Sequence, residues 1–135
     1  MDAERIVIAE RCMKAAHEGS LSFPDIVGEL ISAGFEGYTV DYRCSTQTYY
    51  LPDGDSVVLA MPTTPGAVAK VFDAGAMGAL VRWAQADAPD YSYLAFCERA
   101  KAAGCAGYLV SFLGRRVAYF GRSAETHVEH FPGRP

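Results

Sequence analysis

The spacing of apolar and polar residues predicts a run of helices followed by a run of strands. In residues 3–18, apolar side chains recur at intervals of three and four, which predicts an amphipathic helix. Ser22, with Asp25 three residues later, predicts the start of a second helix, and Gly34 predicts its end. Aromatic or branched residues then alternate with polar ones, which predicts three strands at residues 37–42, 46–51 and 56–61.

The same order of elements is predicted again after the segment Pro62-Thr63-Thr64-Pro65. Thr64 and Pro65 suit the cap and first residue of a third helix, which the apolar pattern extends to about Ala86. A fourth helix is predicted from Ser92 to Ala103, with Gly104 ending it. Three further strands are predicted at residues 107–113, 115–121 and 126–131.

The two halves are similar in sequence at an offset of seventy residues. When residues 21–50 are laid on residues 91–120, no gap is needed, and the densest shared motif reads A-G-x-x-G-Y-x-V. The identical pairs are Ser22/Ser92, Ala33/Ala103, Gly34/Gly104, Gly37/Gly107, Tyr38/Tyr108, Val40/Val110 and Tyr49/Tyr119. We interpret the motif as a helix that ends on glycine and turns into a strand.

These patterns predict an α+β fold made from an internally duplicated helix-helix-strand-strand-strand unit. Short connections between strands predict a mainly antiparallel sheet, and the helices should pack on one face of it. We expect residues 1–135 to form a single domain built from two pseudo-repeats, about 1–62 and 65–131. Each half has too little apolar surface to fold alone, so the halves should share one core.

Composition narrows the classes of function. The chain has 135 residues and a formal net charge of −4, with nine Arg and three Lys, so binding to nucleic acid is disfavoured unless the arginines cluster. No apolar run approaches the length of a membrane span, and the acidic start Met1-Asp2-Ala3-Glu4 does not resemble a secretion signal. We therefore expect a cytoplasmic protein with no membrane partner.

The four cysteines, Cys12, Cys44, Cys97 and Cys105, contain no C-x-x-C pair. Without a secretion signal they are expected to be buried thiols and not disulfides.

Several segments resemble the YbcV-like family of uncharacterised small bacterial proteins, some of which carry the label "phage envelope protein". The segments are Gly37-Tyr38-Thr39-Val40-Asp41-Tyr42, Thr48-Tyr49-Tyr50, Asp53-Gly54, Ala102-Ala103-Gly104-Cys105-Ala106-Gly107-Tyr108, Gly114-Arg115-Arg116-Val117 and Glu125-Thr126-His127-Val128-Glu129, with Phe131 and Pro132. The resemblance implies a single small α+β domain. It implies no activity, cofactor or catalytic residue.

The C-terminal segment holds most of the candidate chemistry. If residues 126–131 are extended, His127 and Glu129 share one face of the strand and His130 lies on the other, so the two histidines do not chelate one metal ion. His127 could act as a general acid or base, with Glu125 or Glu129 orienting its ring. The competing interpretation is a surface strand whose charges keep a sheet edge soluble.

A second candidate site is the sheet face opposite the helices. Thr39, Asp41 and Arg43 are predicted to lie on that face, together with part of the Arg and Tyr residues of the later strands, which would give a polar, aromatic-rich surface. Such a face could bind a ligand or a second copy of the protein, or it could simply be solvated. The residues selected as ligand-binding candidates are Asp41, Arg43, Arg116, Tyr119, Arg122 and His127.

From these features we predict a small ligand-binding or protein-interaction module that forms a homodimer or binds an unknown small molecule. No metal site or cofactor is predicted, and the sequence shows no recognisable catalytic motif. The alternative is a small enzyme acting on an anionic metabolite, with His127 as acid/base and Arg122 or Arg116 as anion clamp.

Overall fold

The fold was analysed in a computed structural model that describes residues 1–131, so the last four residues of the expected domain lie outside the described residues. Helices and strands follow the order helix, helix, strand, strand, strand, twice, which confirms the predicted α+β class. The elements are α1 (Ala3–Glu18), α2 (Phe23–Ser32), β1 (Gly37–Asp41), β2 (Thr46–Tyr50), β3 (Ser56–Ala60), α3 (Ala74–Gln85), α4 (Tyr93–Ala102), β4 (Cys105–Ser111), β5 (Arg116–Gly121) and β6 (Thr126–His130).

Equivalent residues begin the second helix of each half. The Ser22 hydroxyl accepts a hydrogen bond from the Asp25 backbone N–H at the start of α2, and the Ser92 hydroxyl accepts one from the Ala95 N–H at the start of α4. After each helix the chain reverses through a glycine with positive φ, Gly34 after α2 and Gly104 after α4. The shared serine and glycine thus mark the same helix boundaries in both halves.

The six strands form one antiparallel sheet in the order β3-β2-β1-β4-β5-β6. Its strand register repeats at the offset of seventy: Gly37 lies opposite Tyr50, and Gly107 lies opposite Phe120. Where β1 meets β4 at the centre, a Cβ on Gly37 would overlap the Val110 carbonyl oxygen, and a Cβ on Gly107 would overlap that of Val40. Glycine is therefore required at the same position of both central strands.

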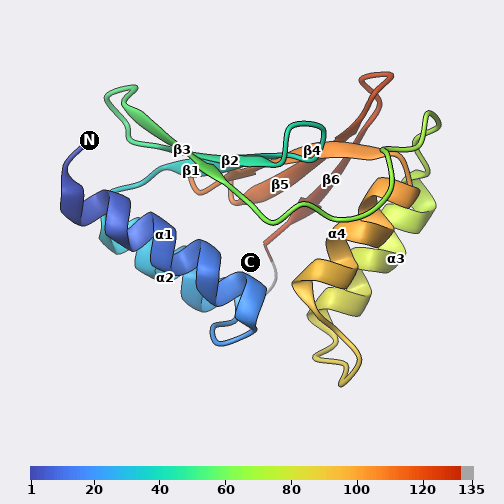
Figure 1. The fold of residues 1–135 in the computed structure, drawn as a ribbon, viewed down its shortest axis with the longest axis horizontal. Helices are drawn as coiled ribbons and strands as arrows, with labels where there is room; N and C mark the ends of the chain where they lie inside the picture. Colours follow the sequence, from blue (N-terminus) through green and yellow to red (C-terminus); the bar gives the residue numbers. More distant parts are fainter. Residues whose placement is uncertain (132–135) are drawn as a thin grey trace.

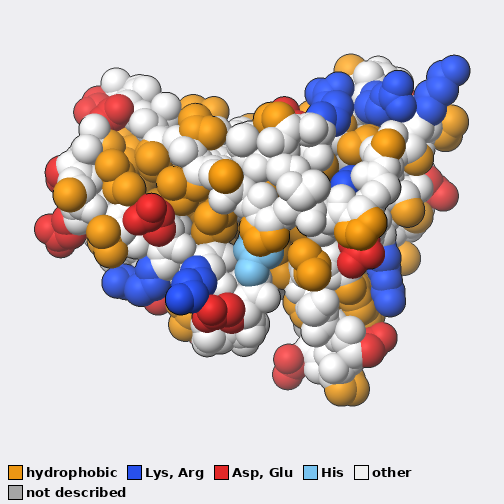
Figure 2. Space-filling view, viewed as in Figure 1, with side chains coloured by type: hydrophobic (Ala, Val, Ile, Leu, Met, Phe, Trp, Pro, Cys, Tyr) orange, Lys and Arg blue, Asp and Glu red, His pale blue; other side chains and the backbone are white. Residues whose placement is uncertain are grey.

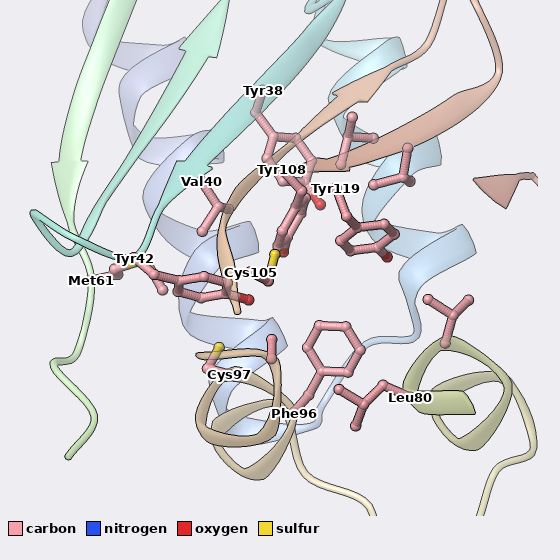
Figure 3. Close-up of a cluster of buried hydrophobic side chains, with 14 of the residues drawn as sticks. Tyr38, Val40, Tyr42, Met61, Leu80, Phe96, Cys97, Cys105, Tyr108 and Tyr119 are labelled. Atoms are coloured by element: carbon pink, nitrogen blue, oxygen red, sulfur yellow. The ribbon is translucent and has the colours of Figure 1, made fainter. Parts of the chain in front are cut away.

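All four helices lie on one face of the sheet, with α1 and α2 under one part and α3 and α4 under the other (Figure 1). The residues between the layers form one hydrophobic cluster with members from both halves, including Leu30, Val40, Cys97 and Val110. Figure 3 shows Tyr38, Tyr108 and Tyr119 extending from the strands toward Phe96 and Leu80 of the helices. No helix of residues 1–131 lies on the other face of the sheet (Figure 1).

The prediction that the third helix begins at Thr64 and Pro65 was wrong, because α3 begins at Ala74 with Asp73 as its cap. The preceding residues are held by long-range contacts instead. The Lys101 ammonium donates hydrogen bonds to the Thr64 carbonyl and hydroxyl, and the backbone N–H of Ala69 donates to the Lys101 carbonyl. Val68 and Phe72 are buried, so their helix-like spacing in the sequence reflects a buried loop.

Three of the four cysteines are buried thiols, as predicted, but Cys44 is exposed. It lies in the turn between β1 and β2, where its backbone N–H donates to the Asp41 carboxylate and its sulfur lies 3.0 Å from the Thr46 hydroxyl oxygen. Cys44 therefore belongs to a polar turn and not to the core.

Among the described helices, none is both long enough and apolar enough to cross a bilayer.

Candidate functional site

The helix-free face of the sheet, here called the open face, has an apolar centre. One residue from each strand lies on a single line across this face, because the paired positions continue from strand to strand. This central row is Val58, Thr48, Thr39, Leu109, Ala118 and Val128. Val58 is 59% exposed, Leu109 43% and Val128 42%. Apolar side chains thus reach solvent at the middle and at both ends of the row.

The rows on either side of the centre carry the charged groups of the open face. One outer row is Ser56, Tyr50, Gly37, Ser111, Arg116 and His130, and the other is Ala60, Thr46, Asp41, Gly107, Phe120 and Thr126. Arg116 and Asp41 are in different rows and two strands apart, which places their backbones roughly 17 Å from each other by strand geometry. The open face therefore has an uncharged centre and a sparse, mixed-charge rim.

The prediction that the open face is polar and rich in aromatic residues was wrong, because most tyrosines of the strands point toward the helices. Tyr38, Tyr49, Tyr108 and Tyr119 are all buried under the helices. Burial raises the pKa of Tyr119 and of Tyr108 above the ordinary tyrosine value, so both hydroxyls stay protonated at neutral pH. Tyr119, selected as a ligand-binding candidate, is 7% exposed and is part of the core.

Some of the tyrosine hydroxyls between the sheet and the helices make hydrogen bonds with other side chains of the protein. The Tyr93 hydroxyl of α4 lies 2.5 Å from the Tyr108 hydroxyl of β4, and the Gln47 side-chain amide donates to the Tyr49 hydroxyl at 2.8 Å. Hydrogen bonds between buried hydroxyls replace those that water would make. The tyrosine layer thus stabilises the contact between sheet and helices.

His127 lies on the helix-covered side of β6, half-buried and opposite Tyr119 in the strand register. Its Nε2 lies 2.5 Å from the Glu129 carboxylate, so these two residues share a face as predicted, while His130 lies on the open face and is exposed. The ring packs against α3 where Gly78 leaves room, since a Cβ there would lie 3.6 Å from Nε2. The pair is held between a strand and a helix.

The remaining arginine candidates are not gathered around His127. The Arg122 guanidinium donates to the Val68 carbonyl at 3.3 Å, Arg43 is exposed in the turn after β1, and Arg116 is on the open face. Among the described residues, no hydrogen bond or ion pair joins an arginine to His127. The six candidates therefore divide between two opposite sides of the sheet and do not form one site.

Two hollows of the described surface lie elsewhere, along α1 and α2, and are lined by Glu4, Ile8, Arg11, Pro24 and Glu29 among others. They are wide and shallow, and neither includes a residue of the six candidates. Within residues 1–131, no group of three or more His, Cys, Asp or Glu is arranged to hold a metal ion.

Sequence reasoning missed the residues that define the open face, namely Val58, Leu109 and Val128. Their alternation with buried neighbours was visible, but which strands meet at the centre was not. A signal was present in the overlay: Val58 and Val128 are equivalent positions of the two halves and are both valine.

Comparison of the sequence with known proteins yields no matching protein-family model and no matching curated protein.

Proposed function

We propose that this protein is an interaction module that binds another protein through the open face of its sheet. The observation that carries the proposal is the central row, in which Val58, Leu109 and Val128 are exposed on a helix-free sheet. Three large aliphatic side chains exposed on one row of a sheet face are costly in a protein that has no partner for them.

The chemistry of the open face fits a protein partner better than a small molecule. Protein interfaces have an apolar centre depleted of charge and a polar rim, which is the distribution formed by the central row and by Asp41, Arg116 and His130 around it. Small-molecule sites are concave and enclose their ligand. The open face is one side of a single sheet layer, without a helix to form a wall (Figure 1).

The charge of the open face also argues against nucleic acid. Arg116 is its only arginine or lysine on the described strands, and Asp41 offsets it. Binding to a phosphate backbone requires several cations on one surface. We also propose that the protein is cytoplasmic and belongs to the YbcV-like family, which it resembles in segments such as residues 37–42 and 102–108.

The test is photo-crosslinking in the source organism, with p-benzoylphenylalanine placed at Leu109. Val7 is the control, because it is 55% exposed but lies on α1, on the helix-covered side of the sheet (Figure 1). We expect a defined protein adduct from position 109 and none from position 7. Equal adducts at both positions, or no adduct at position 109, would contradict the proposal.

A further inference from the structure

The two edge strands of the sheet differ in a way that the repeat makes visible. Position by position, β3 reads Ser-Val-Val-Leu-Ala and β6 reads Thr-His-Val-Glu-His. On the helix-covered side, Val57 and Leu59 of β3 correspond to His127 and Glu129 of β6. Inward-pointing charged side chains are a device that protects an edge strand from pairing with another chain. β6 has this protection and β3 lacks it.

Helix packing increases the difference between the edges. α3 packs against β6, and Gly78 allows close approach to His127. β3 runs along the front of the molecule, above α1, and hydrophobic side chains gather over this region at the left of the view (Figures 1 and 2). The Met1 ammonium lies 2.6 Å from the Asp55 carboxylate, just before the start of β3. The β3 edge itself is an uncharged, exposed strand.

The backbone hydrogen bonds show which residues of β3 face outward. The Leu51 N–H donates to the Asp55 carbonyl, and the Met61 N–H donates to the Ser45 carbonyl. Because hydrogen-bonded pairs alternate along antiparallel strands, residues 55, 57, 59 and 61 direct their backbone groups at β2. Ser56, Val58 and Ala60 direct theirs away from it. Within residues 1–131, no backbone group pairs with Val58 or Ala60 on that side.

We propose that β3 pairs antiparallel with β3 of a second copy of this chain, on a two-fold axis at Val58. In this register Val58 of each copy donates to and accepts from Val58 of the other, and Ala60 donates to the Ser56 carbonyl of the second copy. The Ser56 N–H does not need a partner in the second copy, because it already donates to the Asp55 carboxylate at 2.9 Å. The three outward residues are placed symmetrically about Val58, so the strand is complementary to itself.

The side chains support a second copy as the occupant. Across the proposed axis, Val58 meets Val58, Val57 meets Leu59, and Ser56 meets Ala60, so branched aliphatic side chains pair and no like charges are opposed. The product is a continuous twelve-stranded sheet with the helices on one side. The two open faces then adjoin, which presents the partner with a doubled surface. The pairing does not depend on the proposed function, because it is made by the backbone groups of the β3 edge and not by the side chains of the open face.

The experiment is sedimentation equilibrium of the full chain and of Val58→Pro across a wide concentration range. Proline at an outward edge position removes an N–H that faces solvent in the monomer, so the fold should tolerate it. Val128→Pro is the matched control, since Val128 holds the equivalent outward position on β6. We expect the wild type and Val128→Pro to reach twice 14.6 kDa. Val58→Pro should self-associate at least about tenfold more weakly, because two backbone hydrogen bonds are lost at the axis.

A second variant keeps the proposal testable if Val58→Pro does not fold. Val58→Lys keeps the backbone N–H but places two ammonium groups next to each other at the axis, so it too should self-associate more weakly than the wild type, with a circular dichroism spectrum like that of the wild type. A wild type that stays monomeric at the highest concentration would overturn the proposal. So would dimers of the Val58 variants as stable as those of the wild type. If dimerisation is lost on Leu109→Lys and kept in Val58→Pro, the copies associate through the open face and the edge pairing is wrong.

Discussion

Thr39 of β1 lies directly opposite Leu109 of β4 at the centre of the sheet, and the two residues are seventy positions apart in the chain. Each is therefore paired with its own counterpart in the other half. Such a pair arises only where a pseudo-two-fold axis passes between the two strands. The axis relates the two halves of the sheet and runs through the centre of the open face.

The first prediction concerns the two glycines beside this axis. Gly37→Ala and Gly107→Ala should each destabilise the protein by about 3 kcal/mol or more, because each new Cβ would overlap a carbonyl oxygen of the adjacent central strand. At Gly107 the Cβ would also lie 2.8 Å from the Phe120 ring, so the loss there should be at least as large. Urea denaturation measures both free energies of unfolding. Gly28→Ala is the control, since its Cβ would meet no atom within 4 Å. A Gly37→Ala or Gly107→Ala protein as stable as Gly28→Ala would contradict the close approach of the two central strands.

The second prediction concerns a pair of glycines at which the halves differ. Gly34 and Gly104 both have positive φ, so alanine costs about 1 kcal/mol at each for the backbone alone. At Gly104 a Cβ would also overlap the Val71 carbonyl, whereas at Gly34 it would only touch the Arg5 side chain at 3.6 Å. Gly104→Ala should therefore be clearly less stable than Gly34→Ala in thermal or urea unfolding. Equal stabilities would show that the loop at residues 64–73 does not pack on the end of α4.

The third prediction tests the contact between the loop at residues 64–73 and Lys101 of α4. Lys101→Met removes the ammonium that donates to the Thr64 carbonyl at 2.8 Å and to its hydroxyl at 3.0 Å, and leaves both acceptors buried. The free energy of unfolding should fall by about 2–3 kcal/mol. Lys14→Met is the control, because Lys14 is exposed and its ion pair with Glu18 contributes at most about 0.5 kcal/mol. A Lys101→Met protein as stable as the control would contradict this role of the buried lysine.

The fourth prediction concerns pH. Burial raises the pKa of the core tyrosines above the unfolded value, so between the two values the folded protein keeps protons that the unfolded chain has released. Stability is therefore complete below about pH 9 and falls as pH rises. Above about pH 10 each tyrosine that stays protonated in the folded protein lowers the free energy of unfolding by up to about 1.4 kcal/mol per pH unit. The pKa of the Cys105 thiol is raised to about 11 and adds to the same effect.

Denaturant titrations between pH 7 and pH 11 measure this dependence. The residues involved are Tyr38, Tyr42, Tyr49, Tyr93, Tyr108 and Tyr119. Tyr119→Phe should reduce the slope at high pH, because it removes one of these buried hydroxyls. Stability that stays constant up to pH 11 would mean that these hydroxyls ionise freely in the folded protein.

The element order and most strand boundaries followed from the sequence because they depend on local periodicity and on glycine and serine at helix ends. The start of α3 did not, because the segment before it is shaped by Lys101, which lies in a distant helix. The exposure of Cys44 was also missed, because its burial was inferred from residue type alone, whereas β1 ends at Asp41 and Cys44 falls in the turn that follows.

The candidate site was the less predictable part. The alternation of side chains along β5 places Arg116 and Tyr119 on opposite faces of the sheet. No local pattern, however, shows that β1 and β4 are the central strands. Without that pairing, the line from Val58 through Leu109 to Val128 is not visible in the sequence. The proposed interaction surface depends on long-range register, whereas the ligand-binding candidates were chosen by residue type.

The most direct test of whether the open face binds a partner is carbene footprinting. Labelling of the face is compared between the purified protein at low concentration and the protein inside cells of its source organism. Leu109 and Val128 report on the face, and Val7, Ile31 and Leu94 are exposed controls on α1, α2 and α4. If the open face binds a partner, Leu109 and Val128 should be labelled strongly in the purified protein and protected in cells, with unchanged labelling of the three controls. Equal labelling of Leu109 and Val128 in both settings would contradict binding of a partner at this face.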